Sequence, residues 1–178
     1  SWVKGTKISK RAVADMRIIR IVLILAIALG ATACSKFKTY NGPEVTRVLV
    51  YKQQRKMYLL HHNKVLETYD FGLGFSPVGH KQFRNDGKTP EGEYVIDRRN
   101  PNSEFHLSIG INYPNRNDRE FASSQGKSPG GDIFIHGRPK KYSKGGRDWT
   151  AGCIAVTNKE MEQIYAMVRD GTPISIYP

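Results

Sequence analysis

Short runs of β-type sequence, separated by glycine, proline or asparagine, fill most of the chain after residue 45. Residues 105–111 alternate apolar side chains with polar or small ones, which is typical of a strand with one buried face. Residues 46–52, 56–60 and 65–69 are separated by short polar turns and predict a three-strand meander. Further strands are predicted at 94–96, 132–136, 153–156 and 173–177. The pattern therefore predicts a mainly β domain, either a small β-sandwich or a barrel-like sheet.

One helix is predicted near the C-terminus, packed on this sheet. Thr157 and Glu160 have the spacing of a capping box, in which each side chain accepts a hydrogen bond from the other residue's backbone N–H. Gly171 is the predicted stop signal. The apolar face of the helix consists of Met161, Ile164, Tyr165 and Val168. Residues 46–178 contain no internal repeat, so they are predicted to form one domain.

Residues 16–34 have the parts of a signal peptide. A basic start, Met16 to Arg20, leads into 13 apolar or small residues, 21–33, that end in Ala31-Thr32-Ala33. This run is too short for a membrane-spanning helix, which takes about 20 apolar residues. Residues 1–15 precede the plausible start at Met16 and are set aside as a non-native or over-extended segment. Residues 35–45 are interpreted as a polar linker.

Two fates are open for Cys34, which follows the apolar run. Signal peptidase can cut after Ala33, or Cys34 can become a lipid-modified N-terminus. Ala31 stands three residues before the cysteine, where a lipoprotein leader usually has leucine. A lipid on Cys34 is therefore the only membrane attachment that the sequence predicts.

The chain is strongly basic, with a formal net charge of +12. Without residues 1–34, 22 basic and 15 acidic residues leave a net charge of +7. The basic residues are scattered, and an exported protein does not meet nucleic acid, so no nucleic acid partner is predicted. An anionic polymer of the cell envelope fits this charge better.

Cys153 is the only cysteine in the predicted domain. In an oxidising compartment an unpaired thiol is a liability unless its reactivity is used. A thiol with a pKa of about 8.5 is only slightly ionised at neutral pH, so a nucleophilic cysteine needs a base nearby. His136, at the end of another predicted strand, is the candidate base. The histidines show no paired spacing, so neither a metal nor a cofactor is predicted.

Two segments carry a resemblance to a known family. His136-Gly137, followed by Thr150-Ala151-Gly152-Cys153, resembles the signature of the YkuD-type L,D-transpeptidases, a histidine followed by Ser/Thr-His-Gly-Cys. Residues 88–94 are similar to the Thr-Pro-x-Gly-x-Tyr segment of the same domain. The resemblance extends over residues 46–177 and is strongest to a proteobacterial periplasmic branch with the motif Asp-Trp-Thr-x-Gly-Cys, here residues 148–153.

The resemblance implies a YkuD-like β-sandwich and a periplasmic enzyme that acts on peptidoglycan stem peptides. Such enzymes attack the diaminopimelate carbonyl, form a thioester on the cysteine and pass the acyl group to an amine or to water. The implied roles are nucleophile for Cys153, base for His136, and orientation of His136 by the Gly137 carbonyl. The N–H groups of Gly152 and Cys153 are candidates to bind the oxyanion. The candidate substrate contacts are Thr150, Tyr113, Trp149 and Arg138.

Two positions depart from the family pattern. Ala151 replaces a second histidine, and Ala155 replaces the Asn or Arg of many members. These departures leave transpeptidation and hydrolysis both open, with hydrolysis or exchange favoured, and a lipoprotein linked to peptidoglycan is a further candidate substrate. The alternatives are a catalytically silent envelope-binding domain and an unrelated cysteine peptidase. In such peptidases the cysteine normally precedes the histidine and opens a helix, unlike here.

Overall fold

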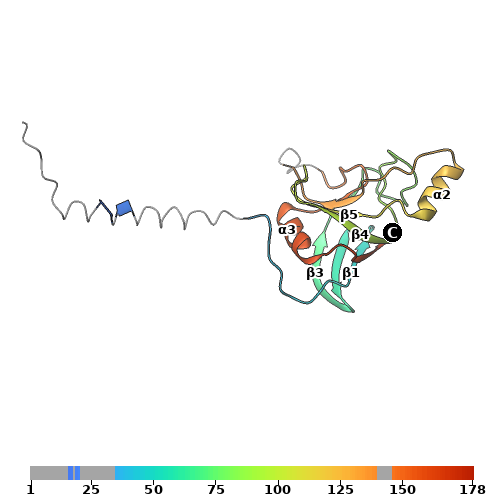
Figure 1. Ribbon diagram of the computed structural model, residues 1–178. Helices are drawn as coiled ribbons and strands as arrows, with labels where there is room; N and C mark the ends of the chain where they lie inside the picture. Colours follow the sequence, from blue (N-terminus) through green and yellow to red (C-terminus); the bar gives the residue numbers. More distant parts are fainter. Residues whose placement is uncertain (1–15, 18, 21–34, 140–145) are drawn as a thin grey trace, which may run out of the picture. The chain divides into compact units, whose positions relative to one another are not determined.

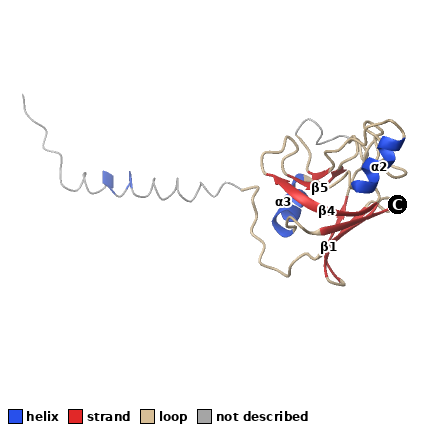
Figure 2. Ribbon diagram, turned by 45° about the vertical axis from the view of Figure 1, so that its right-hand side comes forward, coloured by secondary structure: helices blue, strands red, loops and turns tan. Residues whose placement is uncertain are grey.

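Eight strands of the computed structural model pair into one sheet in the order β3-β2-β1-β8-β4-β5-β6-β7 (Figure 1). The structure describes residues 16, 17, 19, 20, 35–139 and 146–178, and the unit described below begins at Phe37. The strands are β1 (Arg47–Tyr51), β2 (Lys56–His61), β3 (Lys64–Asp70), β4 (Gly92–Asn100), β5 (Ser108–Ile111), β6 (Phe134–His136), β7 (Ile154–Ala155) and β8 (Pro173–Tyr177). The helices are α2 (Arg116–Ser124) and α3 (Asn158–Met167), which lie at opposite sides of the strands (Figure 2).

The first three strands form the predicted meander. β1 pairs antiparallel with β2, and β2 pairs antiparallel with β3. β8 occupies the range predicted for it and inserts between β1, which it meets in parallel, and β4, which it meets antiparallel. The last strand of the chain therefore joins the meander to the half of the sheet that carries β5, β6 and β7.

The sheet curls so that its two edges meet. β4 pairs with β8 along its first half and with β5 along its second half, with a register shift between Ile96 and Arg98. Gly72, just after β3, exchanges two backbone hydrogen bonds with Ala155 of β7, at 2.8 and 2.9 Å. The predicted mainly β fold is confirmed, and its layers come from one curled sheet.

The core lies on the inner face of this curl. In β1 and β2 alternate side chains are buried, whereas in β5 all four residues are buried. The strand expected from residue 105 begins only at Ser108, because His106 has a positive φ of 75° and breaks the extended backbone. Fully burying one such aliphatic side chain contributes about 1.5–3 kcal/mol, so this continuous core fixes the strand positions.

Helix α3 begins where predicted and ends before the predicted stop at Gly171. Thr157 Oγ1 accepts a hydrogen bond from the Glu160 N–H, and the Glu160 carboxylate accepts one from the Thr157 N–H. The helix ends at Met167, because Val168 is already extended. Met161 and Ile164 are fully buried, as expected for the apolar face.

Helix α2 was not predicted, and the expectation of one helix is incomplete. It is short and polar, and only Asp118 and Ala122 are buried on it. Its start signal, a capping box between Asn115 and Asp118, is present in the sequence without an apolar period behind it. In the described part of the chain no helix is long and apolar enough to cross a membrane. Most of the predicted signal peptide lies outside the described residues.

Gly72, which pairs with β7, also lies against the backbone at Arg147, and this contact leaves no room for a side chain. A Cβ at Gly72 would lie 1.8 Å from the Arg147 carbonyl oxygen, so Gly72→Ala must displace backbone on one side or the other. We expect this variant to lose about 1–3 kcal/mol of unfolding free energy in urea denaturation. Gly146→Ala is the control, since nothing lies within 4 Å of a Cβ there. Equal stability of the two variants would contradict the importance of this closure.

Candidate active site

Cys153 and His136 lie on neighbouring strands of the curled sheet. β6 and β7 run parallel, with Ile135 opposite Ile154 and His136 opposite Ala155. Continuing this register places Cys153 opposite Phe134, whose N–H lies 3.4 Å from the Cys153 Sγ. Because alternate residues of a strand share a face, the thiol and the imidazole project to the same side. Both side chains line one cavity of about 340 Å³.

Residues 148–153 form the turn before β7, called the cysteine turn below. A threonine of this turn, Thr150, holds it together. Thr150 Oγ1 donates to the Cys153 carbonyl at 2.7 Å and accepts from the Gly152 N–H at 3.2 Å. Gly152 has a φ of +137°, a backbone conformation that favours glycine. A Cβ there would lie 2.5 Å from the Lys88 carbonyl oxygen. The turn that presents Cys153 is therefore tight and packs directly on the chain at Lys88.

His136 is buried and its ring is oriented by a carbonyl. Nδ1 lies 2.6 Å from the Gly137 carbonyl oxygen, which can only accept, so Nδ1 carries the proton. Nε2 is then the ring nitrogen that can accept a proton, whereas the Cys153 thiol donates to the Asp132 carbonyl oxygen at 3.4 Å. Phe105 stacks on the imidazole with ring centroids 4.4 Å apart. The Trp149 ring meets the imidazole in a T-shaped arrangement with centroids 5.7 Å apart. These two aromatic side chains keep the imidazole in one plane.

Burial shifts both groups toward their neutral forms. Burial raises the pKa of the Cys153 thiol above its ordinary value, against the hydrogen bond from the Phe134 N–H. Burial likewise lowers the pKa of His136, against the hydrogen bond to the Gly137 carbonyl. The resting pair at neutral pH is therefore a thiol and a neutral imidazole.

The thiol is reached by two cavities of different character. The first, described above, includes Phe105, Ser108 and Phe134. The second, of about 310 Å³, is lined by charged residues, namely Arg84, Asp132 and Lys81, whose ammonium pairs with Asp86 at 2.9 Å. Cys153 and Asp132 line both, so two groups can approach the sulfur from different sides. Ala151 also lines the second cavity, whereas Ala155 lines neither.

The four predicted substrate contacts are mostly engaged within the protein. Thr150 closes the turn described above, and Trp149 packs on His136. The Tyr113 hydroxyl donates to the Pro129 carbonyl at 2.9 Å and the side chain is buried. The Arg138 guanidinium lies 5.4 Å from the Trp149 ring and lines a different depression. None of these four lines the two cavities at Cys153, and a contact of any of them with substrate remains a prediction.

Two of the other histidines have carboxylate partners. His80 Nε2 lies 3.1 Å from Asp118, and His106 Nε2 lies 2.9 Å from Glu162. In the described part of the chain, no three metal-ligating side chains gather in one place. His136 is thus the histidine that the fold brings to the cavity of Cys153.

Several residues of the site were missed in the sequence analysis. Phe105 was interpreted as part of a strand, and nothing in the sequence indicates that it stacks on His136. Thr89 lies in the Thr-Pro segment, but its contact with the cysteine turn, a 2.8 Å hydrogen bond from Oγ1 to the Gly152 carbonyl, depends on the tertiary fold. Lys81 and Arg84 are ordinary basic residues of a loop until the fold places them beside Cys153.

A thiol and an oriented imidazole in one cavity of a curled sheet are groups with which a protein can carry out nucleophilic catalysis. Residues 45–176 match the YkuD family, the L,D-transpeptidase catalytic domain. The chain belongs to this family.

Known proteins extend this match. The chain is 28% identical over 145 residues to the putative L,D-transpeptidase YafK of Escherichia coli K12, covering 74% of this chain and 53% of YafK. The helical cell shape determining protein Pgp2 from Campylobacter jejuni is similar with a TM-score of 0.57 and 28% identity, over 77% of this chain and 49% of that one. Bd1075 from Bdellovibrio bacteriovorus is similar with a TM-score of 0.54 and 25% identity, over 79% of this chain and 50% of that one. The chain spans about half the length of the curated relatives it matches.

Proposed function

We propose that this chain is a periplasmic cysteine acyltransferase that acts on peptidoglycan stem peptides at the diaminopimelate carbonyl. The observation that carries the proposal is the shared cavity of Cys153 and His136 within an L,D-transpeptidase domain. The relatives named as L,D-transpeptidases and the net basic charge support an anionic cell-wall substrate.

The geometry supports a two-step mechanism. His136 Nε2 takes the proton of Cys153 as the sulfur attacks the carbonyl carbon, and the tetrahedral oxyanion forms. The oxyanion collapses, the C–N bond breaks, and the leaving amine takes the proton back from His136. The acyl group is then a thioester on Cys153. An acceptor amine or water then attacks that thioester while His136 removes its proton. The C–S bond breaks, the acyl group leaves on the acceptor, and His136 returns the proton to the sulfur, which restores the thiol.

The N–H of Cys153 is the proposed donor to the oxyanion. The Gly152 N–H, also a candidate, is directed at Thr150 Oγ1 at 3.2 Å. It can serve the oxyanion only by leaving or sharing that acceptor. A donor preorganised for the oxyanion contributes more than one that must first give up a partner. We therefore assign most of the stabilisation of the oxyanion to the Cys153 N–H.

We propose that hydrolysis or exchange prevails over cross-linking. Ala151 offers no polar side-chain group to an incoming amine in the second cavity beside the thiol. With fewer polar groups to bind an acceptor amine, water can compete with that amine for the thioester. Release of a lipoprotein linked to peptidoglycan would be one such hydrolysis. Because Pgp2 is described as a helical cell shape determining protein, an effect on cell shape is part of this proposal.

The alternative functions are less well supported. Family membership leaves no reason to invoke an unrelated cysteine peptidase. A silent envelope-binding domain would have no use for an imidazole held at 2.6 Å by a carbonyl beside a thiol. The enzyme is thus the function that the site supports best.

The leader is the basis of the proposed periplasmic location. Residues 16–34 have the pattern of a cleaved signal peptide, with Cys34 as a candidate lipid site. We expect the mature protein to begin near residue 34, and intact mass measurement of the N-terminus checks this. A free N-terminus indicates a protein without an anchor, and a diacylglyceryl adduct on Cys34 indicates a lipoprotein. An uncleaved leader would contradict the export proposal.

Replacing the nucleophile tests the chemistry directly. We expect Cys153→Ala to abolish turnover of defined tetrapeptide muropeptides, because no other thiol lies in the domain. The products of the wild-type protein, read by chromatography and mass, distinguish the two outcomes of the thioester. Tripeptide or freed protein indicates hydrolysis, and diaminopimelate-linked dimers without either would overturn our preference for hydrolysis. Full activity of Cys153→Ala would refute the mechanism.

His136 should control the pH dependence. Protonated His136 cannot accept the thiol proton, and its pKa lies below the ordinary value of about 6.5, so the rate should fall as the pH drops through that lowered pKa. We expect His136→Ala to lose a factor of about 10²–10⁴ in rate. His80→Ala and His106→Ala are matched controls that should keep both rate and pH profile. Equal losses in all three variants would mean that the base is misassigned.

A further inference from the structure

We propose that Thr89 is a positioning residue whose hydroxyl aims the Cys153 N–H at the oxyanion. This inference rests on the proposed function, because it concerns the same thiol. Thr89 is fully buried, and its Oγ1 donates a 2.8 Å hydrogen bond to the Gly152 carbonyl oxygen.

The peptide bond converts this contact into an orientation of the Cys153 N–H. The Gly152 carbonyl and the Cys153 N–H belong to the same peptide unit, and in a planar trans peptide they point in opposite directions. Holding the carbonyl toward Thr89 therefore turns the N–H away from Thr89. If the carbonyl swung free, the N–H would swing with it. An oxyanion donor is effective only when it is fixed before the charge develops.

Close packing at Gly152 also restricts movement of the peptide unit between Gly152 and Cys153. A Cβ at Gly152 would lie 2.5 Å from the Lys88 carbonyl oxygen and 3.2 Å from Ile133. The cysteine turn therefore packs directly on the backbone of Lys88 and on the side-chain hydroxyl of Thr89. The Thr89 hydroxyl is the hydrogen-bonding group of that surface that reaches the Gly152 carbonyl.

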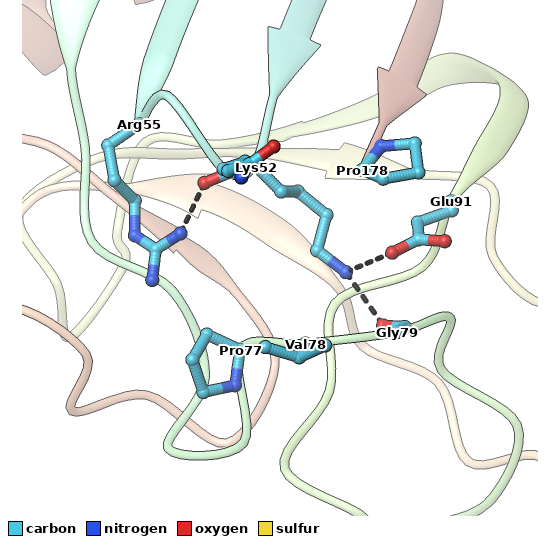
Figure 3. Close-up of a pocket in the computed structure, with 8 residues that line it drawn as sticks. Lys52, Arg55, Pro77, Val78, Gly79, Glu91 and Pro178 are labelled. Carbon is cyan, nitrogen blue, oxygen red and sulfur yellow. Dashed lines mark hydrogen bonds and ion pairs between the residues drawn. The ribbon is translucent and has the colours of Figure 1, made fainter.

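Thr89 is itself held by a buried ammonium group. Lys52 Nζ donates to the Thr89 carbonyl at 3.0 Å, to the Gly79 carbonyl at 2.7 Å and to Glu91 at 2.8 Å. Figure 3 shows this ammonium between Gly79 and Glu91. Only 2% of the Lys52 side chain is exposed.

Breaking these contacts would leave a charge without partners inside the protein, which is strongly unfavourable. Burial lowers the pKa of Lys52, and Glu91 opposes that shift through its hydrogen bond and its charge. Lys52, Thr89 and Gly152 therefore form a chain of hydrogen bonds that runs from the meander to the cysteine turn.

The test compares two thiol reactions that differ in the need for an oxyanion site. Acylation of Cys153 by p-nitrophenyl acetate passes through a tetrahedral oxyanion and releases nitrophenolate. Alkylation by iodoacetamide displaces iodide at carbon and forms no oxyanion. We compare the wild-type chain with Thr89→Ser, which keeps the hydroxyl, and Thr89→Ala, which removes it. Cys153→Ala supplies the background rate of each reagent.

We expect Thr89→Ala to slow acylation about 10- to 100-fold, a loss smaller than that from deleting an oxyanion donor outright. Alkylation should stay close to the wild-type rate, and Thr89→Ser should restore acylation. Equal loss of both reactions, or no loss of acylation, would overturn the proposal. Thr89→Val replaces the alanine variant if that one no longer unfolds cooperatively. Failure of both to fold would assign the hydroxyl a purely structural role and likewise overturn it.

The same experiment separates this inference from the proposed function. Neither reagent resembles peptidoglycan, so the comparison is valid even if muropeptides are not substrates. Selective loss of acylation without any muropeptide turnover would support Thr89 as a positioning residue and refute the proposed substrate.

Discussion

The backbone pairing of Gly72 with Ala155 is the constraint on which the site depends most. β7 has two residues, far too few to hold a strand by one ladder. β6 holds it on one edge and Gly72 holds it on the other, so the strand after Cys153 is fixed from both sides. The curl of the sheet, set by β4 and β8, brings Gly72 there. The position of Cys153 is thus a consequence of how the whole sheet closes.

The chemistry of the pair follows from the same burial. The partly buried thiol has a raised pKa and the buried imidazole has a lowered pKa, so desolvation favours the neutral form of each group. In the proposed mechanism, the neutral imidazole accepts a proton first from the thiol and later from the amine or water. The Gly137 carbonyl makes this possible without a charged partner, because it fixes the tautomer and leaves Nε2 as the acceptor.

Much of this could be predicted from the sequence, and the remainder has a physical reason. The meander, β8 and the cap of α3 follow from local periodicity and capping residues, and these signals are strong over short distances. Cys153 and His136 share a cavity as their motif suggested, although their catalytic roles remain to be tested. Helix α2 was missed because it buries almost nothing. The contacts of Phe105 and Thr89 were missed because partners distant in sequence leave no periodic signal.

Asp148 shows how an ion pair outside the reaction supports the site. Its carboxylate accepts hydrogen bonds from the Leu73 N–H at 2.9 Å and from Arg55, the closest at 2.7 Å. Burial acts to raise the Asp148 pKa, but these donors hold it below the ordinary value. A depressed carboxyl pKa stabilises the fold above the pKa of the unfolded chain, and this stabilisation is lost as the pH falls through the folded value. Arg55 and Leu73 belong to the meander and to the chain leaving it, whereas Asp148 begins the cysteine turn. The ion pair therefore anchors the cysteine turn to the meander. Protonation of Asp148 in acid would weaken this support of Cys153 without changing the thiol itself.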